Sequence, residues 1–245
     1  MEKLYLFKIN ILVDDSLVDE FEHMKFSHFQ TALVSAATMQ CKIYGIDIES
    51  LLKKGLTWVI SKIRIKFNSI PKLGDMLTIE TWPIKSGKLV FDRDFRVKVG
   101  KKIVATASSR WCVIDVNTRK PVRSDLIFSF NDCKAKTTII SDPFVNEIEK
   151  FNNFNETIHK VMGDEIDINN HLNNAKYYNM ALAAIKDIGC NLNKIREVFF
   201  HYLKESLVGD EIVLKSTNFG KTYYVFGYRN NLENDIVFEF NAIVE

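Results

Sequence analysis

The chain has 245 residues, of which 47% are hydrophobic and 26% are charged, values typical of a globular protein that buries a substantial core. The 33 basic and 31 acidic side chains leave a net charge of +2, so the chain as a whole is not drawn to nucleic acid. No stretch approaches the roughly 20 apolar residues of a membrane span, and the start, MEKLYLFKINILVDD, lacks the apolar run of a signal peptide. We therefore expect a soluble, cytoplasmic protein with no nucleic-acid partner and no membrane span.

The first half of the chain is predicted to form one strand, one long helix and then a series of strands. The strand covers residues 4–13, and the helix covers residues 26–45, where apolar residues recur at three- and four-residue spacings. These are Phe29, Leu33, Ala36, Met39 and Ile43, and Gly45 follows as a C-terminal cap. The period then changes to two, and strands are expected at 57–67, 75–84, 88–99 and 102–116. In the first of these, Val59, Ser61, Ile63, Ile65 and Phe67 are predicted to face one side, and Lys62, Arg64 and Lys66 the other.

The second half repeats this order after a polar connection. A strand is expected at 156–162, a helix at 173–189, and further strands at 196–203, 210–219, 221–229 and 235–244. The two halves also align residue by residue: Gly74-Asp75 with Gly209-Asp210, His28 with His171, Ala32 with Ala175, and Gly45 with Gly189.

A unit in which an antiparallel sheet wraps around one long helix is a hotdog fold, so the repeat predicts a double hotdog of the α+β class. The expected organisation is an N-terminal hotdog at 1–128, a linker at 129–153 and a C-terminal hotdog at 154–245.

The two copies differ in a polar stretch before the second helix, DEIDINNHLNNAKYY (164–178). In this alignment Asp167 and Asn169 face Met24 and Phe26 of the first copy, and Glu205 faces Ile70. Polar side chains of this kind are costly to bury unless each finds a partner. The asymmetry favours a site in the second copy and an apolar, packing role for the first. The alternative is a polar turn in which Asn173 or Asn174 only caps the helix.

Metal and nucleotide chemistry are not indicated. Asp167, Asn169, His171 and Asn173 alternate as calcium ligands do, but an EF-hand needs Gly and Glu where Leu172 and Tyr178 stand. The four cysteines form no C-x-x-C pair and are expected to be buried free thiols: Cys41, Cys112, Cys133 and Cys190. Neither a G-x-S-x-G elbow nor a glycine-rich phosphate loop is present.

The segment DINNHLNNAKYY (167–178) resembles the catalytic segment of the acyl-ACP thioesterases, the fatty-acid chain terminators of plants and many bacteria. Further stretches look like that family's landmarks, in the family's order: residues 55–82, RDF (93–95), 108–123 and HYLKES (201–206). The resemblance implies a thioester hydrolase that releases free fatty acid from acyl carrier protein and ends fatty acid synthesis.

The resemblance also implies a catalytic set of Asp167, Asn169, His171 and Glu205. We expect neither a metal nor a cofactor. Family members commonly have a cysteine directly after the glutamate, where this chain has Ser206. Water activated by the polar set is therefore a better hypothesis than a thiolate nucleophile. Asp167, His171 and Glu205 all remain candidates for the general base. Backbone N–H groups near Asn173 and Asn174, at the start of the second helix, would polarise the carbonyl.

The first copy is expected to hold the acyl chain, with Leu33, Ala36, Met39 and Trp58 as candidate lining residues. An acidic carrier protein is expected to dock on basic residues such as Lys62, Arg64, Arg110, Arg119, Lys120 and Arg123. Two alternatives remain open: an acyl-CoA thioesterase of the same fold, and a hotdog protein that binds acyl groups without hydrolysing them. A monomer suffices for two fused copies, although a homodimer is also compatible with the sequence.

Overall fold

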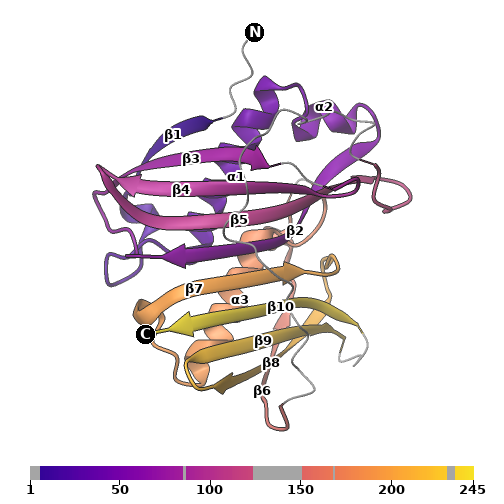
Figure 1. The fold of residues 1–245 in the computed structure, drawn as a ribbon. Coiled ribbons are helices and arrows are strands. Elements are labelled where there is room, and N and C mark those ends of the chain that lie inside the picture. The colour runs from indigo at the N-terminus through magenta and orange to yellow at the C-terminus, as the bar shows by residue number, and fades with distance from the viewer. Residues whose placement is uncertain (1–5, 85–86, 124–150, 168, 231–234) are drawn as a thin grey trace. The chain divides into compact units, whose positions relative to one another are not determined.

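A computed structural model describes residues 6–84, 87–123, 151–167, 169–230 and 235–245 (Figure 1). The chain divides into two compact units, Met1–Ser141 and Asp142–Glu245, called unit 1 and unit 2 below. Most of the predicted linker, and Cys133 with it, lies outside the described residues. Of the other cysteines, Cys190 is buried, Cys41 and Cys112 are half-buried, and all three are free thiols.

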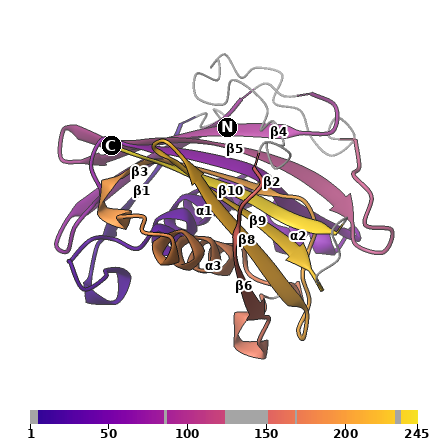
Figure 2. The same cartoon turned by 90° about the horizontal axis from the view of Figure 1, so that it is seen from below.

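Unit 1 is an antiparallel sheet with one long helix across one face (Figures 1 and 2). The helix α1 (Phe26–Ile43) packs against β1 and β3, and a short helix, α2 (Ile48–Leu52), follows it. The strands lie side by side in the order β1-β3-β4-β5-β2. Their bounds are β1 (Phe7–Leu12), β2 (Leu56–Phe67), β3 (Met76–Ile84), β4 (Phe91–Val99) and β5 (Lys102–Asp115).

Unit 2 has the same arrangement. Its helix α3 (Asn174–Asp187) packs against β6, β8 and β9, and its strands lie in the order β6-β8-β9-β10-β7. The bounds are β6 (Asn155–Lys160), β7 (Ile195–Tyr202), β8 (Glu211–Phe219), β9 (Thr222–Arg229) and β10 (Ile236–Val244). Because both units follow one plan, the prediction of two hotdog repeats is confirmed.

The buried face of α1 differs from its prediction near the end of the helix. Phe29, Leu33 and Ala36 are buried as expected, whereas Met39 and Ile43 are 50% and 58% exposed. Gln40 faces the interior instead, because its Oε1 accepts a 2.5 Å hydrogen bond from the guanidinium of Arg93, a buried residue of β4. The apolar spacing alone does not reveal this polar contact.

The predicted alternation of β2 is also interrupted. Lys62 pairs with Arg110 and Ile60 with Trp111, so Ser61 is an extra residue in a β-bulge. The bulge changes which residues are buried: Ile60 is buried before it, and Ile63 after it. The assignment of Val59 and Ser61 to the same side as Ile63, Ile65 and Phe67 was therefore wrong.

The register of the repeat before the helices needs a correction. An isolated bridge joins Val18 to Met24 in unit 1 and Ile166 to Leu172 in unit 2, which makes residue 171 equivalent to His23 rather than to His28. The helix of unit 1 has 18 residues and that of unit 2 has 14, so α1 is longer by about one turn. The alignment of His28 with His171 uses an offset of 143 residues, whereas the bridges give an offset of 148, and the greater length of α1 accounts for most of the difference.

The corrected register changes two of the three predicted contrasts. Asp167 is equivalent to Asp19, not to Met24, and Asn169 is equivalent to Phe21, not to Phe26. The pairing of Glu205 with Ile70 stands, because Gly74 and Gly209 follow them at the same distance with φ near +84° and +87°. Both glycine N–H groups also donate to equivalent carbonyls, those of Val13 and Val161.

Candidate functional site

Residues 165–167 and 169–173 of unit 2 belong to a small hairpin, called the 165–173 hairpin below. The N–H of Asn173 donates to the carbonyl of Glu165 (2.9 Å) at its base, and the N–H of Asp167 donates to the carbonyl of His171 (2.8 Å) near its tip. Asn170 makes the turn with φ of 62°, a conformation that asparagine tolerates better than most residues. The hairpin thus presents Asn169 and His171 from one tight turn.

Asp167 supports this turn from within. Its Oδ1 accepts hydrogen bonds from the backbone N–H groups of Asn169 (2.8 Å) and His171 (3.5 Å). Asp19 of unit 1 accepts equivalent bonds from Phe21 and His23, both at 2.9 Å. Since the same carboxylate arrangement occurs in both units, it builds the hairpin in each.

His171 and Glu205 form the central polar pair. His171 Nε2 lies 3.2 Å from Glu205 Oε2, and the two side chains are 20% and 34% exposed. Glu205 lies in the connection between β7 and β8. The two residues are held together by their neighbours, because the N–H of Leu172 donates to the carbonyl of Ser206 (2.9 Å). This geometry suits an imidazole that takes a proton while a carboxylate fixes its orientation.

Ser206 is placed for support rather than for attack. It is 0% exposed, and its Oγ accepts a 3.0 Å hydrogen bond from the hydroxyl of Tyr177. Burial raises the pKa of Tyr177 to about 12, so this phenol remains a donor at neutral pH. In unit 1 the equivalent positions are Phe29 and Pro71, which cannot form such a bond.

The start of α3 supplies the predicted backbone donors, but not all of them are available. Asn173 is the N-cap, and its Oδ1 accepts from the N–H of Ala175 (2.9 Å). Its own N–H already donates to Glu165. The N–H of Asn174 is the predicted donor for which the described residues provide no acceptor. The hydroxyl of Tyr202 donates to the carbonyl of Asn174 (3.2 Å) and holds this first turn in place.

The candidate acyl-pocket residues all lie in unit 1. Leu33 and Ala36 are fully buried, whereas Met39 is half exposed. Trp58 packs edge-on against Phe91 with ring centroids 4.8 Å apart, and its Nε1 donates to a backbone carbonyl (2.7 Å). An acyl-binding role for these four residues stays a prediction.

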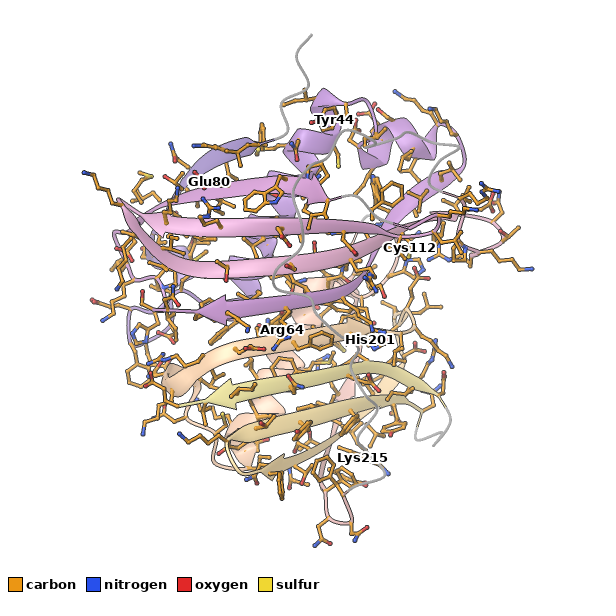
Figure 3. All side chains as sticks on the ribbon, in the orientation of Figure 1. Tyr44, Arg64, Glu80, Cys112, His201 and Lys215 are labelled. Carbon is orange, nitrogen blue, oxygen red and sulfur yellow. The ribbon has the colours of Figure 1, made fainter. Side chains whose placement is uncertain are left out.

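Several cations on the sheets are already neutralised. Arg110, one of the predicted docking residues, donates two hydrogen bonds to the carboxylate of Asp92, at 2.8 and 3.0 Å. Glu80, labelled in Figure 3, is buried and binds Lys8, Arg96 and Lys98. The charge of Arg110 is therefore only partly available to a partner. Docking by the remaining residues, Lys62, Arg64, Arg119, Lys120 and Arg123, stays a prediction.

Two family models match the chain, one to each half. The acyl-ACP thioesterase N-terminal domain covers residues 2–126, and the acyl-ACP thioesterase C-terminal domain covers residues 148–241. The chain belongs to the acyl-ACP thioesterase family. Acyl-ACP thioesterase structures also share the double hotdog fold of this chain. That of Bacteroides thetaiotaomicron superposes with a TM-score of 0.81 over 100% of both chains at 22% identity. The 12:0-ACP thioesterase of Umbellularia californica gives 0.80 over 98% of this chain and 97% of its own, at 17% identity.

Curated acyl-ACP thioesterases match more partially. The chloroplastic acyl-[acyl-carrier-protein] hydrolase FATB2 of Cuphea viscosissima is 28% identical over 68% of this chain and 42% of its own length. The palmitoyl-acyl carrier protein thioesterase of Cuphea hookeriana is 27% identical over 75% of this chain and 47% of its own length. This chain thus spans about half the length of these relatives. None of the helices in its described part is long and apolar enough to span a membrane.

Proposed function

We propose that the protein hydrolyses the thioester of fatty acyl-ACP and releases free fatty acid. The observation that carries the proposal is the contact between His171 and Glu205 beside the 165–173 hairpin, in a chain of the acyl-ACP thioesterase family. Unit 2 would carry the chemistry, and unit 1 would hold the acyl chain.

In this proposal His171 is the general base, and Glu205 orients its ring through Nε2. His171 Nδ1 takes a proton from water, whose oxygen attacks the carbonyl carbon. The carbon–sulfur bond then breaks, and the proton passes to the departing thiolate, so the products are a fatty acid and the free carrier thiol. General base catalysis of this kind contributes roughly 10²–10⁴-fold. Sulfur is a good leaving group, so no covalent acyl-enzyme is needed.

The developing oxyanion needs a donor that is in place before the reaction. The N–H of Asn174, at the positive end of the α3 dipole, would supply it, and the side-chain amide of Asn169 would hold the water or the carbonyl. Removing one such donor from an acyl-transfer site costs about 3–4 kcal/mol of transition-state stabilisation. Asp167 would contribute by holding the backbone of Asn169 and His171.

The test is the release of free fatty acid from one acyl group carried on acyl carrier protein and, separately, on coenzyme A. The parent protein is compared with His171→Ala and Glu205→Ala. The matched control is His23→Ala, which removes the equivalent histidine from the hairpin of unit 1. We expect faster turnover of the carrier-protein substrate, losses of about 10²-fold or more for both unit 2 variants, and parental rates for His23→Ala.

A clear preference for the coenzyme A substrate would reject the carrier-protein assignment and favour an acyl-CoA thioesterase. Equal activity in the parent and both unit 2 variants would reject the catalytic pair. Acyl binding without turnover by the parent would identify a binding protein instead.

A further inference from the structure

A second histidine–glutamate pair lies at the base of the 165–173 hairpin. His159 Nε2 on β6 is 2.8 Å from Glu165 Oε2, and the same oxygen accepts the backbone N–H of Met162 (3.0 Å). The side chain of Glu165 is only 13% exposed. Burial raises the pKa of Glu165, but the bonds from Met162 and His159 outweigh this effect and lower it overall.

The pair is specific to unit 2. The strands β1 and β6, the turns that follow them and the two hairpins are equivalent when 148 residues are added to the unit 1 number. By this register Ile11 occupies the position of His159, and Leu17 that of Glu165. The N–H of Lys25 donates to the carbonyl of Leu17, just as the N–H of Asn173 donates to that of Glu165. The backbone is shared, so the polar pair is not needed to form the hairpin.

The pair attaches the hairpin to strand β6 of the sheet. Glu165 is bonded to Asn173 through its backbone and to β6 through its side chain. A further attachment is the bond from Leu172 to the carbonyl of Ser206, next to Glu205. Together the two fix the hairpin between β6 and the segment that carries Glu205. A shift of about 1 Å in a catalytic group can cost about 10²-fold in rate. Loss of the contact between His159 and Glu165 is therefore expected to lower activity.

We propose that His159 and Glu165 are positioning residues that hold the 165–173 hairpin where His171 meets Glu205. The inference rests on the proposed hydrolase function of that pair. In this proposal neither residue touches the reacting atoms. They act by fixing the backbone that carries His171, so that His171 contacts Glu205. Lys176, in the first turn of α3, is a further charge that acts on Glu165.

The experiment measures kcat, KM and thermal midpoint for Glu165→Leu, Glu165→Gln, His159→Ile and the double variant His159→Ile with Glu165→Leu. The leucine and isoleucine are the residues that unit 1 has at these positions. Glutamine keeps an oxygen that can accept from Met162 and His159. The control is Glu245→Gln, which weakens the ion pair between Arg196 and Glu245 in the same unit, away from the hairpin.

We expect Glu165→Leu to lower kcat roughly 10–100-fold with little change in KM, because the chemical step needs the geometry more than substrate binding does. Glu165→Gln should recover to within about threefold of the parent, and the double variant should be no worse than Glu165→Leu alone. The control should match the parent. A merely structural role would lower the thermal midpoint and the active fraction, and a lower active fraction reduces the apparent kcat at unchanged KM. We therefore expect the loss to persist when kcat is calculated per folded protein, well below the thermal midpoint of each variant.

Three results would overturn the proposal: parental kcat in Glu165→Leu, equal losses in the leucine and glutamine variants, or additive losses from His159→Ile and Glu165→Leu. An inactive parent would instead reject the proposed hydrolase function. The two failures are therefore distinguishable.

Discussion

Replacing Asp19 by alanine is expected to destabilise the chain about twice as much as replacing Asp167. Asp19 accepts two backbone N–H bonds at 2.9 Å, whereas Asp167 accepts one at 2.8 Å and a marginal one at 3.5 Å. A hydrogen bond to a charged group contributes about 1.5–3 kcal/mol, and the lower end applies at half-exposed positions such as these. The expected loss in unfolding free energy is therefore about 3 kcal/mol for Asp19→Ala and about 1.5 kcal/mol for Asp167→Ala.

The three tryptophans of the chain, Trp58, Trp82 and Trp111, all lie in unit 1. Tryptophan fluorescence therefore follows the unfolding of unit 1, while far-UV circular dichroism follows the whole chain. For a chain of this size each kcal/mol shifts the thermal midpoint by about 2–4 °C. We expect Asp19→Ala to lower the fluorescence midpoint by about 6–12 °C.

The two variants should rank the other way in activity: Asp167→Ala should lower it more than Asp19→Ala. Asp167→Ala loosens the hairpin that carries His171 and should lower kcat, whereas Asp19→Ala should leave kcat unchanged when it is measured well below the lowered midpoint. Glu20→Ala, at an exposed neighbouring position, is the control for both measurements. A larger destabilisation by Asp167→Ala, or none by Asp19→Ala, would refute the view that these carboxylates build equivalent hairpins.

Three further changes test the packing, the missing cysteine and one buried acid. In Gly227→Ala the new Cβ would lie 2.2 Å from the ring of Phe238, so we expect a loss of about 1–3 kcal/mol in chemical denaturation. Ser206→Cys should keep parental activity and resist thiol reagents in the folded protein, because the position is buried against Tyr177. Burial raises the pKa of Asp94 from 3.8 to about 6, so the folded state binds the extra proton. Stability from that group is present below pH 3.8 and lost as the pH rises to about 6; Asp94→Asn should therefore gain stability over the parent across this interval.

Each of these has a contrary outcome. Gly163→Ala meets no atom within 4 Å and is the control for Gly227→Ala; equal effects of the two would reject the packing argument. Rapid labelling of the Ser206→Cys thiol, with loss of activity, would show that the position is open to reagents. A stability difference between Asp94→Asn and the parent that does not vary between pH 4 and 6 would reject the raised pKa.

Local patterns sufficed for most of the fold. Strands and helices were predicted from the period of two and from the spacing of three and four, which depend on neighbours along the chain. The predicted bounds therefore lie within a few residues of the observed ones. The errors came from contacts distant in sequence. Gln40 faces inward because Arg93 lies on a strand 53 residues further on. The bulge at Ser61 is set by pairing with β5, which a single strand's pattern does not contain.

The candidate site divides in the same way. The polar stretch was recognisable from residue type, and Glu205 from its contrast with Ile70 of the other copy; the structure brings His171 and Glu205 together. The equivalence of Asp167 with Asp19 was missed, because the sequence pattern does not show that α1 is one turn longer than α3. The pair of His159 and Glu165 was missed as well. The sequence feature that could have identified this pair is the contrast with Ile11 and Leu17, which appears only in the corrected register.

The corrected register also limits which residues can distinguish an active copy from an inactive one. An aspartate and a histidine occur in both hairpins, so they are not sufficient for the proposed chemistry. The differences lie around them: Glu205 in place of Ile70, Tyr177 and Ser206 in place of Phe29 and Pro71, and His159 and Glu165 in place of Ile11 and Leu17.

These differences depend on one another. A carboxylate placed at Ile70 alone would be buried without the hydrogen-bonded frame that surrounds Glu205, and an unpartnered buried charge is strongly destabilising. In unit 2 the hydroxyl of Ser206 is hydrogen-bonded to Tyr177. The carboxylate of Glu165 contacts His159, and the carboxylate of Glu205 contacts His171. Since Ser206 is buried and the side chain of Glu165 is mostly buried, both depend on their partners, and we expect the polar set to be gained or lost together. One unit of the repeat can therefore hold all of it while the other keeps an apolar interior.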